Sequence, residues 1–468
     1  MKSTRLFTTF QDFEGRTDSL EEFILDAINI HKTSLPVRTA VEADLYDKQR
    51  NKTINDYVQT IFTITGQSVE NWTASNNKIA SNFFSILNIQ RCSYSLGNGI
   101  SFASSDREGD KTKEALGDKE IDTALFDVAY AALKHGVAFG MWNLDKLYLF
   151  PYTEFVPLWD EETGALRAGI RYWRLSPDRP LQAVLYEESG YTVFKAANED
   201  DTTLKQQDEQ HAYKVTYQQA PADVAPEIIG EENYGKLPII PMWGSRTHES
   251  TLVGLKQSID AYDIIKSGFA NDLTDCAQVY WLIENYGGMT DKDLAKFRDR
   301  LLLNHVATAD TSQGGKVTPY AQQIPYEARR VMLDDLRAGM YRDFCALDTS
   351  SISANAKTAT EIQAAYQPVD NAASDFENQV SKFLQQLLNI VGIEDTPVFT
   401  RNKVANQLEQ VQMVNSQAQY LDQETILRKY PNVSQDEVDE ILSRRDAEDI
   451  DRMGVGQWTS DTNTPSEE

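Results

Sequence analysis

Apolar residues recur every three or four positions in two separate stretches of the second half of the chain. The first stretch holds seven such positions, which are Leu252, Leu255, Ile259, Tyr262, Ile265, Phe269 and Leu273. This spacing predicts a helix of about six turns, because 3.6 residues per turn bring these positions onto one face. The second stretch follows Pro325 and includes Leu333, Leu336, Met340 and Phe344. We expect two long helices that can pack side by side.

Shorter elements separate these two helices. Residues 278–284, 305–309 and 316–320 read as strands, and residues 291–303 read as a charged amphipathic helix. The sequence therefore predicts a small α/β insertion at the end of a helical stalk.

A third apolar stripe alternates steps of four and three residues. Its members are Ile362, Tyr366, Val369, Ala373, Phe376, Val380, Phe383, Leu387 and Ile390. Pro368 interrupts the stripe, so we expect either one long kinked helix or two helices that meet there. Residues 347–358 precede the stripe, and their small polar side chains predict a loop.

The first half of the chain mixes helices with strands. Ser19 and Glu22 predict a helix start, and a helix is expected from Asn76, with Ile79, Phe83, Ile86 and Leu87 pointing inward. The range 118–135 reads as a helix that precedes a hairpin of residues 137–142 and 146–150. Residues 166–217 read as an antiparallel meander, 220–235 as a loop and 237–241 as an extended entry to the first long helix.

After the third stripe we expect a strand at 397–400, helices at 402–420 and 422–430, and a capped helix start at Ser434. Eleven acidic and three basic residues lie between Ser434 and the last residue, and the final fifteen residues lack apolar periodicity. These observations predict a helical end followed by a disordered tail. The fold class is α+β, with two to four domains expected from 468 residues.

Charge and composition narrow the function classes. With 41% hydrophobic and 25% charged residues, the chain resembles ordinary globular proteins. The net charge of −26 disfavours a protein that grips nucleic acid through a general basic surface. The amino terminus has no signal-peptide core and no apolar run is long enough to span a membrane, so we expect an intracellular enzyme, a scaffold or a subunit of a large assembly.

Motifs for catalysis, metal binding or a cofactor are weak. Gly314, Gly315 and Lys316 are followed by Val317, so the phosphate-binding loop of an ATPase is incomplete. The five histidines are scattered without a partner at metal-ligand spacing, and the pair Asp334 and Asp335 reads as a solvated helix face. We therefore expect no catalytic residue, no metal and no cofactor. The alternative is an intracellular hydrolase whose catalytic site is brought together only by the fold.

Three blocks of sequence resemble the bacteriophage portal proteins, in particular those of long-tailed phages of Gram-positive bacteria. The first is SNNKIASNFFSILNIQRCSYSLGNGISF, with Asn76 to Ile79, Ser93, Tyr94, Leu96 and Gly97. The second is KLPIIPMWGSRTHESTLVGLKQSIDAYDIIKSGFANDLTD, in which Ile259 to Asp263 and Asn271-Asp272 are most similar. The third is the run Ile324 to Arg329, followed by the polar loop and the helix from Lys357 to Ile390.

This resemblance implies a ring, usually a dodecamer, at one capsid vertex, through which double-stranded DNA is packaged and ejected. It implies a portal-like division of the chain into an α/β wing (1–250), two stem helices (251–276 and 325–346), an α/β clip (277–324), a channel loop (347–358), a long kinked helix (359–392), a helical crown (393–453) and a tail (454–468). The implied partners are other copies of the chain, the terminase large subunit, a head-completion adaptor, scaffold and major capsid proteins, and DNA in the channel, with no membrane. The implied locations are the virion and, during assembly, the host cytoplasm. A phage assembly scaffold other than a portal remains an alternative.

The resemblance also assigns roles to residues. The channel loop would present Asp348, Thr349, Ser350, Ser351, Ser353, Asn355 and Lys357 to DNA. Small polar groups of this kind form hydrogen bonds with phosphates that break easily, which suits sliding. The stem helices would pack through Ile259, Tyr262, Phe269, Leu333, Leu336 and Met340, and Pro368 would set the kink of the long helix.

Overall fold

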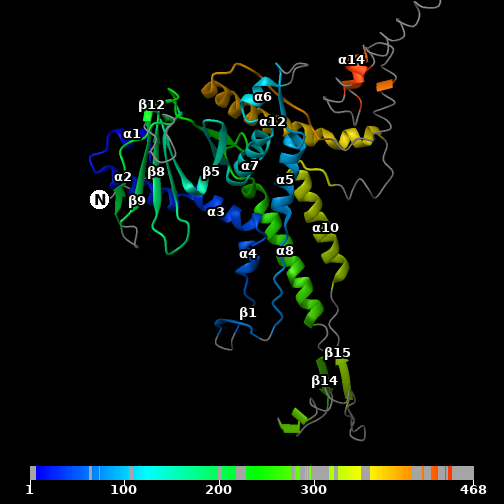
Figure 1. Cartoon of the computed structure of the whole chain (residues 1–468). Coiled ribbons are helices and arrows are strands. Elements are labelled where there is room, and N and C mark those ends of the chain that lie inside the picture. Colours follow the sequence, from blue (N-terminus) through cyan, green and yellow to red (C-terminus); the bar gives the residue numbers. More distant parts are fainter. Residues whose placement is uncertain are drawn as a thin grey trace, which may run out of the picture. The chain divides into compact units, whose positions relative to one another are not determined.

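The computed structural model describes the chain in two compact units (Figure 1). The described residues are 7–62, 66–72, 74–104, 110–197, 203–217, 228–275, 280–284, 290, 292–293, 295–296, 316–320, 325–348, 359–402, 414–415, 423–428, 430, 438 and 441–444. Unit 1 comprises residues 1–37, 89–249 and 346–468, and unit 2 comprises residues 38–88 and 250–345. Both units combine helices and strands, so the α+β class is confirmed.

A five-stranded antiparallel sheet forms one half of unit 1. Its strand order is β10 (Leu204–Gln206), β9 (Gly190–Ala196), β8 (Gln182–Glu187), β7 (Leu166–Trp173) and β6 (Phe155–Trp159), which confirms the meander from β7 to β10. The last part of the expected meander, β11 (Lys214–Tyr217), pairs outside this sheet. Helices α1 (Phe10–Glu14) and α2 (Leu20–Thr33) pack on it through Phe13, Ile24 and Ile28. The Ser19 hydroxyl accepts a hydrogen bond from the backbone N–H of Glu22 and so caps α2.

The other half of unit 1 surrounds a three-stranded sheet. Strands β13 (Ile239–Trp243), β4 (Val137–Asn143) and β5 (Lys146–Pro151) form an antiparallel sheet that packs with α7 (Lys119–His135) and α12 (Ala359–Val391). Gly140 permits this packing, because a Cβ at that position would lie 2.5 Å from the ring of Phe383. α12 continues through Pro368, so the long helix is confirmed over the alternative of two separate helices.

Smaller elements complete unit 1. They are α6 (Lys111–Ala115), the 3₁₀ turn η1 (Tyr152–Glu154), the pair β3 (Ile100–Phe102) and β16 (Pro397–Phe399), the pair β11 (Lys214–Tyr217) and β12 (Ile228–Glu232), and α14 (Gln423–Arg428).

Unit 2 is built around two long helices. α8 (Thr251–Asp275) and α10 (Tyr326–Asp343) confirm the first two apolar stripes, and β14 (Tyr280–Glu284) pairs with β15 (Lys316–Tyr320). The unit also contains most of α3 (Leu35–Asp47), α4 (Lys52–Asn55), and the strands β1 (Thr60–Phe62) and β2 (Ser68–Glu70), which pair with each other. α5 (Phe83–Leu96) begins in unit 2 and ends in unit 1.

Three expectations from the sequence are wrong. The helix expected from Asn76 begins only at Phe83, because the backbone N–H groups of Asn77, Ile79 and Ser81 bond to side chains of α8 instead. Ile86, expected to point inward, is 46% exposed. The loop expected at 220–235 contains strand β12, which pairs with β11.

Other expectations concern residues outside the described ranges. These include most of the charged helix at 291–303, the strand at 305–309, most of the helix at 402–420, Ser434 and the tail. In the ranges that the structure describes, no helix is both long and apolar enough to cross a membrane.

Candidate functional site

The α8–α10 pair of unit 2 contains all six of the residues expected to pack the stem. Ile259 and Met340 are almost completely buried, while Tyr262, Phe269, Leu333 and Leu336 are partly buried. The rings of Phe269 and Tyr326 lie with centroids 5.8 Å apart, and Arg329 Nη2 lies 2.5 Å from Asp272 Oδ2. An apolar contact and an ion pair therefore join the end of α8 to the start of α10.

A second aromatic group joins the middle of α8 to the end of α10. The ring of Phe83 makes edge-to-face contacts with Tyr262 of α8 and Tyr341 of α10, with centroids 5.0 Å and 6.4 Å apart. Such contacts prefer this perpendicular geometry because the ring edge is positive and the ring face negative. The pair is thus fixed at two heights along α8.

A buried polar stripe occupies another face of α8. Asn271 Oδ1, Ser267 Oγ and Asp263 Oδ1 accept hydrogen bonds from the backbone N–H groups of residues 77, 79 and 81, at 2.6, 2.9 and 2.9 Å. Two residues of extended chain span about 6.6 Å and four residues of helix span about 6 Å, so the two repeats match. We call this arrangement, residues 77–81 with Asp263, Ser267 and Asn271, the α8 zipper.

The zipper accounts for polar side chains in the second block that resembles portal proteins, and it joins them to backbone N–H groups of the first block. Asn77 and Ile79 belong to the first block, and Asp263 and Asn271 belong to the second. Sequence reasoning did not predict that these blocks meet. The detectable signal was the spacing of Asp263, Ser267 and Asn271, since polar residues four apart lie on one helix face.

Asp263 is the centre of the zipper. Its side chain is fully buried, and Oδ2 accepts a second hydrogen bond, 2.5 Å long, from Asn51 Nδ2. Burial raises the pKa of this carboxyl above its ordinary value of 3.8, while the hydrogen bonds from Asn51 and Ser81 oppose that shift. The geometry makes Asp263 an acceptor that positions the backbone.

The carboxylate of Asp260, one turn earlier on α8, also has partners within the protein. It accepts hydrogen bonds from Tyr46 Oη at 2.5 Å and Thr53 Oγ1 at 2.8 Å, and Lys256 Nζ lies 2.5 Å from its Oδ2. These contacts tie α3 and α4 to α8. Within the described ranges, no three His, Cys, Asp or Glu side chains are grouped as metal ligands would be.

Only the first two residues of the expected channel loop, 347 and 348, are described. Asp348 is described, whereas Thr349, Ser350, Ser351, Ser353, Asn355 and Lys357 lie outside the described residues. At the start of the loop, the carbonyl of Leu347 accepts a hydrogen bond of 2.9 Å from Gln90 Nε2. Beyond the loop, Tyr366 of α12 stacks on Tyr94 of α5 with ring centroids 6.0 Å apart, so α5 contacts the chain at the start of the loop and after it.

Arg401 binds the part of α12 that follows Pro368. Its guanidinium donates two hydrogen bonds to Glu377, at 2.9 and 2.7 Å, one to Asp370 at 3.0 Å and one to Ser374 at 2.7 Å. These acceptors lie on successive turns, and the two bonds to one carboxylate give a planar fork. Sequence reasoning missed this contact because Arg401 lies 24 residues from Glu377, outside any helical repeat.

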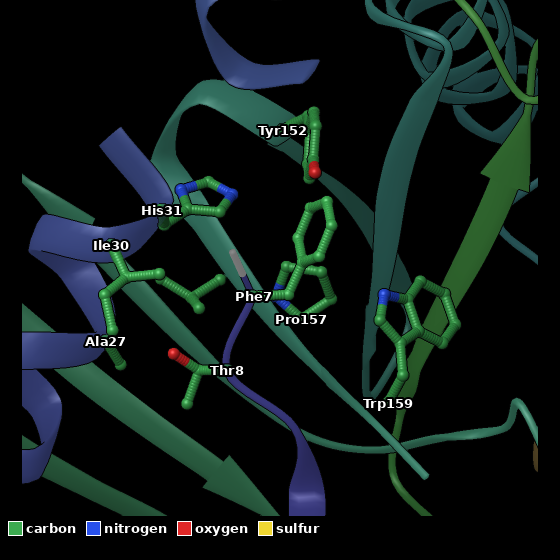
Figure 2. Close-up of a pocket in the computed structure, with 9 residues that line it drawn as sticks. Phe7, Thr8, Ala27, Ile30, His31, Tyr152, Pro157 and Trp159 are labelled. Carbon is green, nitrogen blue, oxygen red and sulfur yellow. The ribbon is translucent and has the colours of Figure 1, made fainter. Parts of the chain in front are cut away.

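A pocket of about 260 Å³ in unit 1 surrounds His31 (Figure 2). Phe7, Tyr152 and Trp159 contribute aromatic rings to its lining. Tyr172 donates to the Thr153 carbonyl at 2.7 Å, so the 3.2 Å contact between Tyr172 Oη and His31 Nδ1 requires Nδ1–H as the donor. His31 Nε2 is therefore the unprotonated ring nitrogen, which can accept a hydrogen bond.

The electrostatics of this pocket disfavour acid–base chemistry. Burial, with a smaller contribution from Lys32, lowers the pKa of His31 to about 3, so the ring is neutral near pH 7. None of the side chains that line the pocket is a carboxylate or a thiol. A hydrolase site assembled here would have only the Thr8 hydroxyl as nucleophile and a weakly basic His31 as base, with no carboxylate in the pocket lining to orient the ring.

Comparison with known proteins gives a consistent result. The family model described as "Phage portal protein, SPP1 Gp6-like" matches residues 40–451. A "Portal protein" of Clostridium phage phiCD119 is 23% identical over 390 residues, which cover 78% of this chain and 83% of that relative. A "Portal protein" of Bacillus phage SPP1 is 22% identical over 382 residues, which cover 76% of this chain and 72% of that relative.

Proposed function

Because the chain belongs to the phage portal protein family of the SPP1 Gp6 type, we propose that it forms the ring at one capsid vertex through which double-stranded DNA is packaged and ejected. Proteins of this family are structural parts of the virion and assemble as homo-oligomeric rings.

The packed pair of α8 and α10 is the observation that best supports this proposal. A DNA conduit needs a rigid wall, and the two helices are joined at both heights by aromatic contacts and by the ion pair of Arg329 with Asp272. The paired strands β14 and β15 lie between the two helices in chain order, as a clip would. We assign residues 251–276 and 325–346 to the stem and 277–324 to the clip.

The other assignments follow the same family order. Residues 1–250 form the wing, 347–358 the channel loop, 359–392 the kinked helix, 393–453 the crown and 454–468 the tail. The loop would approach DNA through its small hydroxyl side chains, and Lys357 is its only basic residue. Transient hydrogen bonds to phosphates would let DNA slide, whereas many basic contacts would hold it.

We assign no enzymatic activity to the chain. ATP hydrolysis would be performed by the terminase large subunit docked on the ring, which agrees with the incomplete phosphate-binding loop at Gly314 to Val317. A head-completion adaptor, scaffold protein and the major capsid protein would contact other faces. The ring, usually a dodecamer in this family, would assemble in the host cytoplasm.

Electron microscopy of the purified protein tests the proposal. Annular particles with a central hole are expected, together with DNA packaging that fails when the protein is omitted. A monomer or a small closed dimer would contradict the ring and favour an enzyme. Rings that are dispensable for packaging would point to an assembly scaffold of another kind.

A further inference from the structure

Strands β1 and β2 of unit 2 form a hairpin whose apolar side chains are exposed. Ile61 and Val69 face each other across the pair, and both are more than 40% exposed. Phe62 is 79% exposed and Trp72, just beyond β2, is 84% exposed. All six residues of the two strands are exposed, so neither face of this hairpin is covered by the described part of the chain.

Such a hairpin needs a partner to be stable. A two-stranded pair is marginally stable in water unless further strands or a helix pack on it. Exposed apolar groups that gather in one place mark an interaction surface, whereas single exposed residues do not. Tyr57 and Val58, which precede β1, are also exposed and extend the surface.

The α8 zipper fixes the position of the hairpin relative to α8. Asn77, close after Trp72, bonds to Asn271 through its backbone N–H and to Thr274 through its side chain, at 2.6 and 3.4 Å. The hairpin therefore emerges beside the last turns of α8. Its place is set by hydrogen bonds within unit 2.

α10 lies on the opposite side of α8. Residues 269 and 271 are two positions apart, which is about 200° around a helix axis. Phe269 faces Tyr326 of α10, while Asn271 faces the backbone of Asn77. Figure 1 shows the hairpin and α10 on opposite sides of α8.

The first turns of α10 expose apolar side chains, together with charged side chains of both signs, at the same height along α8. Tyr326, Met332 and Val331 are exposed, Val331 by 67%, and the neighbouring Arg330 side chain is 68% exposed. Between residues 53 and 77 the only charged residues are Asp56 and Glu70, both acidic. The hairpin and the start of α10 therefore both expose apolar side chains. Arg330 also offers Glu70 an opposite charge, because its own contact with Asp334 is exposed and long, at 3.8 Å.

A closed ring requires this arrangement of surfaces. Each subunit meets its neighbours through two different patches, and rotation about the ring axis keeps the patches at one height. We propose that the β1–β2 hairpin of one subunit packs on the start of α10 of the neighbouring subunit. This inference rests on the proposed function, a ring of identical subunits. Phe62 and Trp72 would cover Val331 and Met332, with Glu70 close to Arg330.

Substitutions in the hairpin test this contact. Phe62→Asp and Trp72→Asp should each raise the protein concentration at which half of the subunits are in rings by roughly tenfold or more, because each places a charge in an apolar contact. Mass photometry measures the ring fraction, and circular dichroism melting checks that the subunit stays folded. Leu175→Asp is the matched control, since Leu175 is 78% exposed in unit 1 and should leave assembly unchanged.

A charge exchange tests the pairing itself. Glu70→Arg and Arg330→Glu should each weaken assembly, and the double variant should recover it. Wild-type rings together with hairpin variants that assemble like Leu175→Asp would overturn this inference and leave the proposed function intact. Wild-type protein that forms no rings would overturn both.

Discussion

Asp263 is a single residue on which the packing of residues 77–81 against α8 depends. Its carboxylate accepts hydrogen bonds from Asn51 and from the backbone of Ser81 while fully buried. Asp263→Ala removes both, and we expect the free energy of unfolding to fall by about 3 kcal/mol, since bonds to charged groups are worth about 1.5–3 kcal/mol each. Chemical denaturation measures this loss. Asp334→Ala is the control, because the Asp334 side chain is 71% exposed and should matter little.

The raised pKa of Asp263 adds a pH signature to the same site. Because the folded state holds the proton more tightly, the stabilisation from protonation is complete below pH 3.8 and is lost as pH rises through the folded pKa. The unfolding free energy of wild type relative to Asp263→Asn should therefore decline above pH 3.8. A constant difference across this range would contradict a buried, destabilised carboxylate.

His31 should act in the opposite direction. Its pKa is lowered from 6.5 to about 3, so the folded state favours the neutral ring and stability is lost as pH falls through this interval. Between these two pKa values, the free energy of unfolding should fall by up to roughly 1.4 kcal/mol for each pH unit of acidification. Thermal unfolding of wild type and His31→Phe between pH 7 and pH 4 checks this, and equal slopes for the two proteins would rule it out.

At the scale of elements, the Arg401 contact supports α12 just after its proline. A proline inside a helix removes one hydrogen bond and costs about 3 kcal/mol, so neighbouring contacts must compensate. Arg401→Lys cannot form the two hydrogen bonds to the Glu377 carboxylate, and we expect the free energy of unfolding to fall by about 1–2 kcal/mol. This figure is at the low end for charged hydrogen bonds because the Arg401 side chain is partly exposed to solvent. Arg246→Ala, at an exposed ion pair with Asp375 of the same helix, should change stability much less.

Pro368 itself is predicted to shape α12 for assembly. Pro368→Ala restores the backbone donor and should raise the melting temperature of the isolated subunit. If the proline sets a bend that the ring requires, the same variant should form fewer rings or package less DNA. Normal rings and normal DNA filling in this variant would remove that role.

The three long helices show how far periodicity reaches. Their apolar stripes predicted α8, α10 and α12, because a helix repeats every 3.6 residues and its buried face is a local pattern. The same reasoning failed between Asn76 and Ser81, where the backbone bonds to the side chains of α8. It also missed β12, because this strand forms by pairing with β11, which is separated from it along the sequence.

For the whole molecule, the net charge of −26 leads to a prediction about transport. If acidic side chains keep the channel from gripping DNA, Asp348→Lys at the start of the channel loop should slow packaging at low salt and recover as salt screens the new contact. Packaging rates at two ionic strengths measure this. Glu162→Lys, an exposed wing residue with the same charge change, is the control. Unchanged packaging of Asp348→Lys at low salt would contradict the idea.

The division between sequence and tertiary structure follows from the range of each interaction. Local repeats were sufficient for the mixed fold class, the long helices and the meander, and three blocks of sequence in a characteristic order were sufficient to indicate the portal family. Long-range contacts were needed for the α8 zipper and the Arg401 contact, which join residues up to about 200 positions apart. The exposure of the β1–β2 hairpin depends on what the rest of the described chain leaves uncovered. A side chain's neighbours depend on the folding of the whole chain, and a local pattern does not contain that information.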